Sequence, residues 1–300
     1  MQLSKRPIRS LMAAAIALAA LPAMAGESPF SRTVFLGDSL TDSGYYRPLI
    51  QPADARPVTG QFTTNPGLVW AQVVAGYYGT DANPNGNGQI GDNYAVGGAR
   101  VGVDLTQPAF GNVPVPSLKT QTARYLAANG GKADANALYT VWGGANDLFS
   151  ITAPAQAPAV IGAAVTDQIG IVASLKQAGA QYVMVPNLPD IGSSPGFIDR
   201  GAAGRAQGTA LATAYNNALY GGLKQAGIEF IPLDTYTLLH EIIANPGMYG
   251  FSNVTGRACL VASSLSCSPL AYVRPDAAST YLFADDVHPT SAAHQMLGQY

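Results

Sequence analysis

The chain has 300 residues, of which 48% are hydrophobic and only 11% are charged, and its formal net charge is -2. Soluble chains carry about 25% charged residues on average. This chain is therefore poor in charge, yet apolar enough to build a large core, which excludes disorder as its main state. A balance so close to neutral also lacks the basic excess that nucleic-acid binding requires, so nucleic acid is not an expected partner.

The first 25 residues have the pattern of a secretory signal peptide. Three basic residues within the first nine positions precede a short apolar run over 11–21, and an Ala-Met-Ala cleavage site follows at 23–25. About ten apolar residues cannot span a bilayer that needs about 20, so we do not expect a membrane anchor here. The sequence predicts a signal peptide over 1–25 and one exported domain over 26–300.

Beyond this leader, apolar runs of strand length alternate with stretches of helical period, which is typical of βα units around a mostly parallel sheet. The expected elements, in chain order, are a strand over 33–36, a helix over 68–78, a strand over 93–96, a helix over 118–128, a strand over 138–142, a helix over 157–177, a strand over 182–185, a helix over 202–225, a strand over 228–231, a helix over 235–244 and a helix over 291–300. No low-complexity linker or internal repeat divides them. The sequence therefore predicts a single α/β domain.

The two cysteines, Cys259 and Cys267, enclose a Ser-rich polar stretch of seven residues. An oxidising compartment allows such a pair to close a small surface loop, so we expect a disulfide rather than two buried thiols. Two cysteines and three scattered histidines do not fit the spacings of structural zinc sites. No metal or other cofactor is expected.

A serine follows the first expected strand at its C-terminal end, where open parallel sheets place their active sites. Ser39 lies within Gly-Asp-Ser-Leu-Thr-Asp-Ser-Gly over 37–44, a tight turn that contains glycine. In such a turn we expect the hydroxyl to be exposed at the sheet edge, with the backbone N–H directed into the same space. The alternative role for an isolated serine at this place is a helix N-cap.

A candidate general base lies near the C-terminus, in the stretch Asp-Asp-Val-His-Pro. Histidine is the side chain best suited to take a proton from serine near neutral pH, and a carboxylate three residues earlier can fold back to bond its other ring nitrogen. This spacing favours Asp285 over Asp286 as the partner of His288. Of the other histidines, His240 lies in an apolar helix, where we expect a core or surface role, and His294 lies within the last helix.

Acyl transfer also needs N–H donors directed at the developing oxyanion. Asn-Tyr-Ala-Val-Gly-Gly-Ala over 93–99 offers a glycine N–H, from Gly97 or Gly98, on a loop after an expected strand. Gly-Gly-Ala-Asn-Asp over 143–147 offers the side-chain amide of Asn146 in an equivalent position. Each signal is weak alone, because Gly-Gly pairs commonly form turns and Asn-Asp commonly caps helices.

Together these four stretches resemble the SGNH, or GDSL, family of esterases and lipases, in the family's order and over nearly the whole mature chain. The resemblance implies a three-layer α/β/α sandwich with a mostly parallel, flavodoxin-like central sheet. It implies Ser39 as the nucleophile, His288 as the general base and acid, and Asp285 as the residue that orients the imidazole. The oxyanion hole would consist of the N–H groups of Ser39 and Gly98 and the side chain of Asn146. Gly97 is the alternative to Gly98.

A second serine motif competes with Ser39. Gly-Ser-Ser-Pro-Gly over 192–196 fits the G-x-S-x-G nucleophile elbow and follows an expected strand. In that elbow the residue after the serine donates its backbone N–H to the oxyanion, and Pro195 has no N–H. Ser194 is therefore expected to be a loop residue.

These features predict an exported serine ester hydrolase that forms an acyl-enzyme on Ser39. Fatty-acyl esters and lysophospholipids are the preferred substrates, because aromatic residues that suit an apolar acyl chain cluster around the first two motifs. These residues are Tyr45, Tyr46, Phe62, Trp70, Tyr77 and Tyr78. The alternatives are a carbohydrate O-deacetylase of the same fold, acyl transfer to an alcohol, and a non-catalytic surface binding or adhesion module. The presence of all five expected site residues argues against the last.

The motifs are most similar to those in the passenger domains of autotransporter esterases, in which a C-terminal β-barrel anchors the enzyme to the outer membrane. This chain departs from that pattern, because it ends at Tyr300, soon after the histidine motif, without the alternating strands of a barrel. We therefore expect an exported protein that is secreted, periplasmic or displayed on the outer-membrane surface through a barrel that this chain does not contain.

Overall fold

The computed structural model describes residues 28–50 and 59–300, so the expected signal peptide lies outside the described residues. A four-stranded sheet forms the centre, in the order β1-β4-β5-β6, and all of its pairings are parallel. Its strands are β1 (Thr33–Gly37), β4 (Leu138–Trp142), β5 (Tyr182–Pro186) and β6 (Ile231–Leu233). This arrangement confirms the expected α/β class with a parallel central sheet.

The segment 93–96 lies against the free edge of β1 but is not the regular strand that the sequence predicts. The N–H groups of Tyr94 and Val96 donate to carbonyls of β1 at 2.8 and 3.1 Å, whereas Asn93 alone of the four forms a bridge. The chain then turns away at Gly97, before a ladder can extend. When this segment is counted as the second strand, the spatial order becomes 2-1-3-4-5, which is the flavodoxin-like order.

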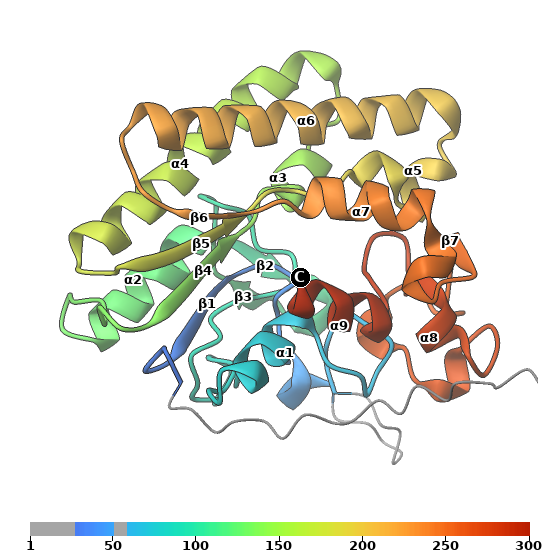
Figure 1. Cartoon of the computed structure of the whole chain (residues 1–300), viewed down its shortest axis with the longest axis horizontal. Coiled ribbons are helices and arrows are strands. Elements are labelled where there is room, and N and C mark those ends of the chain that lie inside the picture. The colour runs from blue at the N-terminus through green and yellow to red at the C-terminus, as the bar shows by residue number, and fades with distance from the viewer. Residues whose placement is uncertain (1–27, 51–58) are drawn as a thin grey trace, which may run out of the picture.

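Helices cover both faces of the sheet. In the described residues they are α1 (Trp70–Tyr77), α2 (Leu118–Ala128), α3 (Ala145–Phe149), α4 (Ala157–Gln177), α5 (Pro195–Ile198), α6 (Gly201–Gln225), α7 (Thr235–Ala244), α8 (Ala277–Thr280) and α9 (Ser291–Gln299). Figure 1 shows α4 and α6 on one side of the sheet and α1 and α9 on the other. The fold is thus the expected three-layer sandwich.

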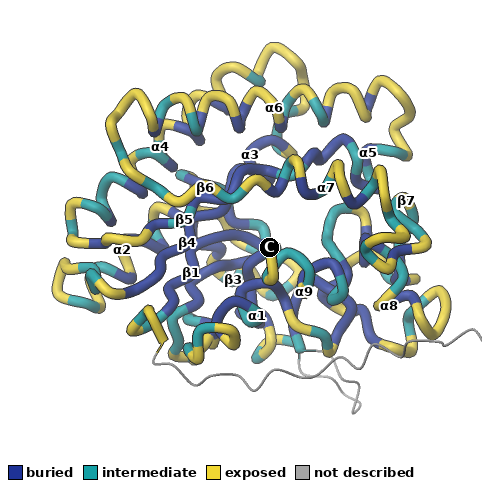
Figure 2. Tube along the Cα trace, in the orientation of Figure 1, coloured by how far each residue is buried: buried dark blue, intermediate teal, exposed yellow. Residues whose placement is uncertain are grey.

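Alternation along the strands explains why a separate hydrophobic cluster lies on each face of the sheet. Val34 and Leu36 of β1 belong to the cluster that includes buried residues of α2, α4 and α6, whereas Phe35 belongs to the cluster around Trp70 of α1. Successive side chains of a strand point to opposite faces, so one short apolar run serves both layers. Figure 2 shows β1 and β4 as buried along their length and the outer sides of α4 and α6 as exposed.

Helix α4 is the one helix of the described residues that is long and apolar enough, by length and composition, to cross a membrane, over 154–177. Its Ile161, Val172 and Leu175 side chains are buried in the larger core cluster. The helix also packs on α6. Burial against the sheet and α6 therefore accounts for part of its hydropathy, since 33% of the apolar window is buried.

Two small sheets outside the centre were not predicted. Strands β2 (Leu105–Gln107) and β3 (Val113–Val115) form an antiparallel pair, and β7 (Asn253–Arg257) pairs in parallel with β8 (Tyr281–Phe283). Strands β2, β3 and β8 have three residues each, which is too short for alternation to be detected in a sequence. The expected strand over 228–231 was also placed too early, since the chain enters the sheet only at Ile231.

Candidate active site

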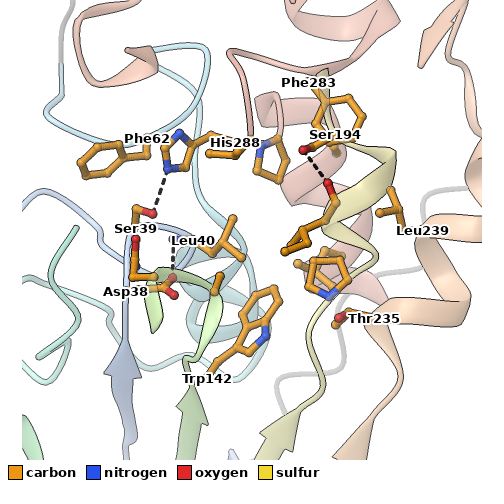
Figure 3. A pocket seen from close by; sticks show the side chains of 18 of the residues that line it. Asp38, Ser39, Leu40, Phe62, Trp142, Ser194, Thr235, Leu239, Phe283 and His288 are labelled. Atoms are coloured by element: carbon orange, nitrogen blue, oxygen red, sulfur yellow. Dashed lines mark hydrogen bonds between the residues drawn. The ribbon is translucent and has the colours of Figure 1, made fainter. Parts of the chain in front are cut away.

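The structure brings Ser39, His288 and Asp285 together at the C-terminal end of the sheet. The Oγ of Ser39 lies 2.8 Å from Nε2 of His288, and Nδ1 of His288 lies 2.8 Å from Oδ2 of Asp285. A carboxylate can only accept a hydrogen bond, so Nδ1 carries the ring proton and Nε2 is left to accept the hydroxyl proton of Ser39. Figure 3 shows the bond between Ser39 and His288 at the wall of a cavity.

The turn after β1 fixes the serine. The main-chain carbonyl of Asp38 accepts the N–H groups of Thr41 and Asp42, both at 3.0 Å. The side chain of Asp38 accepts the N–H of Leu40. Glycine is needed at 37, because a Cβ there would lie 2.9 Å from the carbonyl oxygen of Trp142. The sharp turn leaves the side chain of Ser39 directed at the imidazole.

Hydrogen bonds from three backbone N–H groups hold Asp285. Its Oδ1 accepts from Val287 at 3.0 Å and from His288 at 2.8 Å, and its Oδ2 accepts from Ser264 at 2.7 Å. Burial alone raises the pKa of this carboxyl. The adjacent imidazole and these hydrogen bonds outweigh burial and hold the pKa of Asp285 below its ordinary value. Asp285 is therefore ionised wherever the imidazole works as a base.

The environment of His288 favours its protonated form. Burial lowers the pKa of His288, but the charge of Asp285 and the hydrogen bond to it more than offset burial, so the pKa is raised above its ordinary value. The ring of Phe62 packs on the imidazole, with 4.9 Å between the ring centroids. The ring is thus held from two sides, by a carboxylate at its edge and an aromatic ring over its plane.

The two candidate glycines differ in what their N–H groups do. The N–H of Gly97 donates to Oδ2 of Asp42 at 2.9 Å. Within the described residues the N–H of Gly98 has no hydrogen-bond acceptor, and neither has that of Ser39. Gly98 has φ = +85°, in the left-handed region that favours glycine. Of the two glycines, Gly98 is therefore the one with a free donor.

Asn146 completes the donor set. Its Nδ2 donates one hydrogen to the carbonyl oxygen of Ala99 at 3.0 Å. An amide nitrogen carries two hydrogens, so the second remains for a ligand. Asn146, Gly98 and Ser39 line the same cavity. Two backbone N–H groups and one amide hydrogen that the sequence predicts at an oxyanion hole therefore belong to residues of one cavity wall.

A cavity of about 300 Å³ extends from the serine between α7 and the C-terminal segment. Most of its wall is apolar, and six side chains that contribute to it are Leu40, Trp142, Phe149, Leu239, Phe283 and Leu297. Figure 3 shows Leu40, Trp142, Leu239 and Phe283 around this space. Ligand pockets of this kind combine an apolar wall with a few placed polar groups.

The expected aromatic lining is largely wrong. Of the six aromatic residues near the first two motifs, Phe62 alone lines the cavity. Tyr46 is buried in the larger core cluster, Trp70 is buried in the cluster on the other face of the sheet, and Tyr77 is exposed. The apolar wall comes instead from α7 and the segment after β8, which are distant in sequence. These residues could not be recognised from sequence, because their apolar spacing is the same as that of any helix whose apolar face packs against a core.

The remaining histidines take other partners. His240 is about half-exposed and its Nε2 lies 3.0 Å from Oδ2 of Asp190. His294 is fully buried, its Nδ1 accepts the N–H of Trp70, and burial, with a smaller effect of His288, lowers its pKa to about 3. Neither is hydrogen-bonded to a serine hydroxyl. Among the described residues no cluster of three or more His, Cys, Asp or Glu could hold a metal ion.

Ser194 of the competing motif lines the same cavity but is engaged elsewhere. Its Oγ donates to the carbonyl oxygen of Ile191 at 2.7 Å. Pro195 opens α5, as a proline at the first position of a helix commonly does. Within residues 28–50 and 59–300, Ser194 thus has no basic partner, and the residue that follows it has no N–H.

Cys259 and Cys267 form a disulfide. The loop that they close is not purely a surface loop, as the sequence predicted, because Ser264 and Leu265 within it are buried. Leu265 belongs to the larger core cluster and Ser264 contacts Asp285. No signal in the sequence points to this contact, since a backbone N–H is present in every residue except proline.

Comparisons with known proteins give a family match and several similar proteins. A family model described as GDSL-like lipase/acylhydrolase matches residues 33–300. Lipase 1 of Photorhabdus luminescens is 26% identical over 93% of this chain and 51% of its own length. Esterase EstA of Pseudomonas aeruginosa is 31% identical over 92% of this chain and 47% of its own length. The chain thus spans about half the length of these two relatives.

A solved structure of a lipolytic G-D-S-L family protein from Veillonella parvula shares 13% identity, with a TM-score of 0.47. The match covers 89% of this chain and 94% of that one.

Proposed function

Because the chain belongs to the GDSL-like lipase/acylhydrolase family, we propose that it is an exported serine esterase that hydrolyses fatty-acyl esters, lysophospholipids included, through an acyl-enzyme. The observation that carries this proposal is the hydrogen-bonded series of Ser39, His288 and Asp285 at the wall of an apolar cavity. Nucleophile, base and orienting carboxylate are within hydrogen-bond reach of one another, as nucleophilic catalysis requires.

In the first half of the reaction, Nε2 of His288 takes the hydroxyl proton of Ser39 while Oγ forms a bond to the ester carbonyl carbon. The tetrahedral intermediate then collapses, the bond to the alcohol oxygen breaks, and His288 gives the proton to the leaving alcohol. In the second half, water attacks the acyl-enzyme with the same base, and Ser39 regains its proton as the carboxylic acid leaves. Asp285 stays ionised and stabilises the imidazolium in each half.

The oxyanion that forms in each half is stabilised by the N–H groups of Ser39 and Gly98 and by the amide of Asn146. These donors are fixed before substrate binds, because the serine lies in a tight turn, the glycine loop is tied through Gly97, and the amide is tied to Ala99. Donors preorganised in this way lower the activation free energy, because they stabilise the negative charge of the transition state and need not change position during the reaction.

The cavity supports a fatty-acyl substrate over an acetyl ester. Its wall toward α7 and the C-terminal segment is apolar, with Leu239, Phe283 and Leu297 among its side chains. Burying one methylene is worth about 0.8 kcal/mol, so a longer chain gains binding free energy that acetate cannot. An acetyl group would leave most of about 300 Å³ unfilled.

Export is supported by two independent features. The first 25 residues have a signal-peptide pattern, and the disulfide between Cys259 and Cys267 is of a kind that persists in oxidising compartments. We propose release or display outside the cytoplasm on this basis.

The test is hydrolysis of a p-nitrophenyl ester series from acetate to palmitate by the wild type, by Ser39→Ala and by Ser279→Ala. Ser279 lies exposed on α8, outside the cavity lining, and serves as the matched control. We expect turnover of medium or long chains, its loss by several orders of magnitude in Ser39→Ala, and wild-type rates in the control. Activity confined to acetate would favour the deacetylase, and an inert wild type or an active Ser39→Ala would refute the esterase mechanism.

A further inference from the structure

The loop closed by Cys259 and Cys267 reaches the carboxylate that orients the imidazole. The N–H of Ser264 donates to Oδ2 of Asp285 at 2.7 Å, and both residues are buried. The same Oδ2 lies 2.8 Å from Nδ1 of His288. One carboxylate oxygen is therefore shared between the loop and the catalytic ring.

This contact differs from the other two N–H bonds of Asp285. Val287 and His288 donate to Oδ1 from the same turn, two and three residues further along the chain. Ser264 donates from a segment 21 residues away, and in the described part of the chain it is the one distant N–H bound to this carboxylate. Nδ1 of His288 lies within reach of both carboxylate oxygens, 2.9 Å from Oδ1 and 2.8 Å from Oδ2, so the Ser264 bond is the contact through which a distant segment can influence how the carboxylate faces the imidazole.

The disulfide closes the segment that contains Ser264 into a ring. The outgoing end of the loop is held beside the strand that leads to Asp285, since Ala258 N–H donates to the carbonyl of Phe283 at 2.9 Å and Cys259 N–H donates to that of Ala284 at 3.0 Å. The returning end is joined to this fixed end by the bond to Cys267. The disulfide ring is thus hydrogen-bonded at Cys259 to Ala284, the residue before Asp285, and it contains Ser264, which donates to Asp285.

A second contact steadies the same residue from the other side. Nδ2 of Asn65, a fully buried residue, donates to the carbonyl oxygen of Ser264 at 2.9 Å. The hydroxyl of Ser264 is buried without a hydrogen-bond partner. The backbone of Ser264, rather than its side chain, therefore makes the contacts at this place.

We propose that the Cys259–Cys267 disulfide is a positioning element for catalysis, which holds the N–H of Ser264 against Asp285 so that full turnover requires the bridge. The proposal rests on the proposed esterase function. A hydrogen bond to an ionised group is stronger than one between neutral groups, so we expect about a tenfold fall in kcat when the bridge is absent. The loop does not line the cavity in the described residues, so KM should stay within about twofold.

The experiment compares the double variant Cys259→Ala/Cys267→Ala with the wild type, oxidised and after reduction under native conditions. Ser266→Ala is the matched control, since Ser266 is an exposed residue of the same loop. Circular dichroism checks that each protein is folded, and kcat and KM are measured on one ester. The low-field proton NMR resonance of Nδ1–H of His288 is recorded as well, because it reports the bond to Asp285 without substrate.

We expect lower kcat with unchanged KM, a shifted or broadened resonance in the bridge-free enzyme, recovery of both on reoxidation of the wild type, and no change in the control. Wild-type kcat in a folded, bridge-free enzyme would overturn the proposal. So would a joint change of KM and kcat, or unfolding of both the variant and the reduced wild type, since the bridge would then serve the fold as a whole. If the wild type hydrolysed no ester, the NMR signal would still test the positioning role separately from the esterase function.

Discussion

The carboxylate of Asp42 accepts the backbone N–H of Gly97 at 2.9 Å, and this bond joins the serine turn to the glycine loop. The other oxygen of Asp42 accepts the N–H groups of Gly44 and Tyr45. One buried side chain thus holds two segments 55 residues apart. Because the N–H of Gly97 is used in this way, the N–H of Gly98 is the one of the two without an acceptor in the described residues, and we propose it as the oxyanion donor.

Asp42→Asn should disturb the oxyanion donors without touching the nucleophile. An asparagine has one acceptor oxygen, so its NH₂ group must face either the N–H of Gly97 or those of Gly44 and Tyr45. We expect kcat to fall about tenfold or more, with a smaller effect on KM. The measurement is kcat and KM on a medium-chain ester. An unchanged kcat in a folded variant would show that catalysis does not depend on the bond between Asp42 and the glycine loop.

Asn146→Ala removes a whole oxyanion donor. Loss of one such donor typically costs a factor of about 10² to 10³ in kcat, and we expect a loss in that range with KM nearly unchanged. Because Asn146 also binds the carbonyl of Ala99, the thermal midpoint should be measured in parallel. A fall in KM and kcat together, or a small effect on both, would place the amide outside the oxyanion hole.

The pH dependence should report on His288. The imidazole is a base only when neutral, and its pKa is raised by Asp285, so kcat/KM should decline on the acid side with a midpoint above about 6.5. Asp285→Asn removes the charge that raises this pKa, so the acid limb should move to lower pH while kcat falls by about 10⁴. A pH–rate profile of both proteins checks this, and an unmoved limb would contradict the pairing.

The chain-length preference should depend on α7. Leu239 lines the cavity, and Leu239→Trp places a larger side chain in the space that we assign to the acyl chain. Over the range of lengths that fit, kcat/KM of the wild type should rise by up to about fourfold per methylene. The variant should lose long-chain esters and keep short ones. Met248→Trp is the control, because Met248 is 83% exposed and does not line the cavity; equal chain profiles in both variants would refute this assignment.

Three buried carboxyls should make stability fall as the pH rises from about 4 to about 7. His294, whose pKa is lowered to about 3, opposes this trend, because the unfolded imidazole loses its proton in the same range. Burial raises the pKa of Asp38 to about 7 and the pKa values of Asp42 and Asp147 to about 6, from an ordinary value of 3.8. A group whose pKa is raised by folding stabilises the fold below its unfolded pKa, and this contribution is lost as the pH rises through the folded pKa. Thermal midpoints between pH 4 and pH 8 test this. The change should be smaller in Asp38→Asn.

The local parts of the site could be predicted from sequence. Ser39 lies in a turn whose residues are contiguous, and the bond between Asp285 and His288 spans three positions, so both follow from short-range geometry. The alternation of strands and helices and the parallel sheet were likewise evident from apolar periodicity. The exceptions were the five-residue strand β7, the three-residue strands of the two small sheets, and the edge segment 93–96, where the pattern is too short to distinguish a ladder from an extended loop.

The tertiary structure decided what depends on segments distant along the chain. The choice of Gly98 over Gly97 follows from the carboxylate of Asp42, and the apolar wall comes from α7 and the C-terminal segment rather than from aromatics near the serine. The N–H of Ser264 reaches Asp285 only because the disulfide loop folds back. Backbone N–H groups are the same in every residue but proline, and apolar side chains look alike whether they fill a core or line a cavity. Sequence therefore names the reactive side chains, and packing alone assigns the groups that surround them.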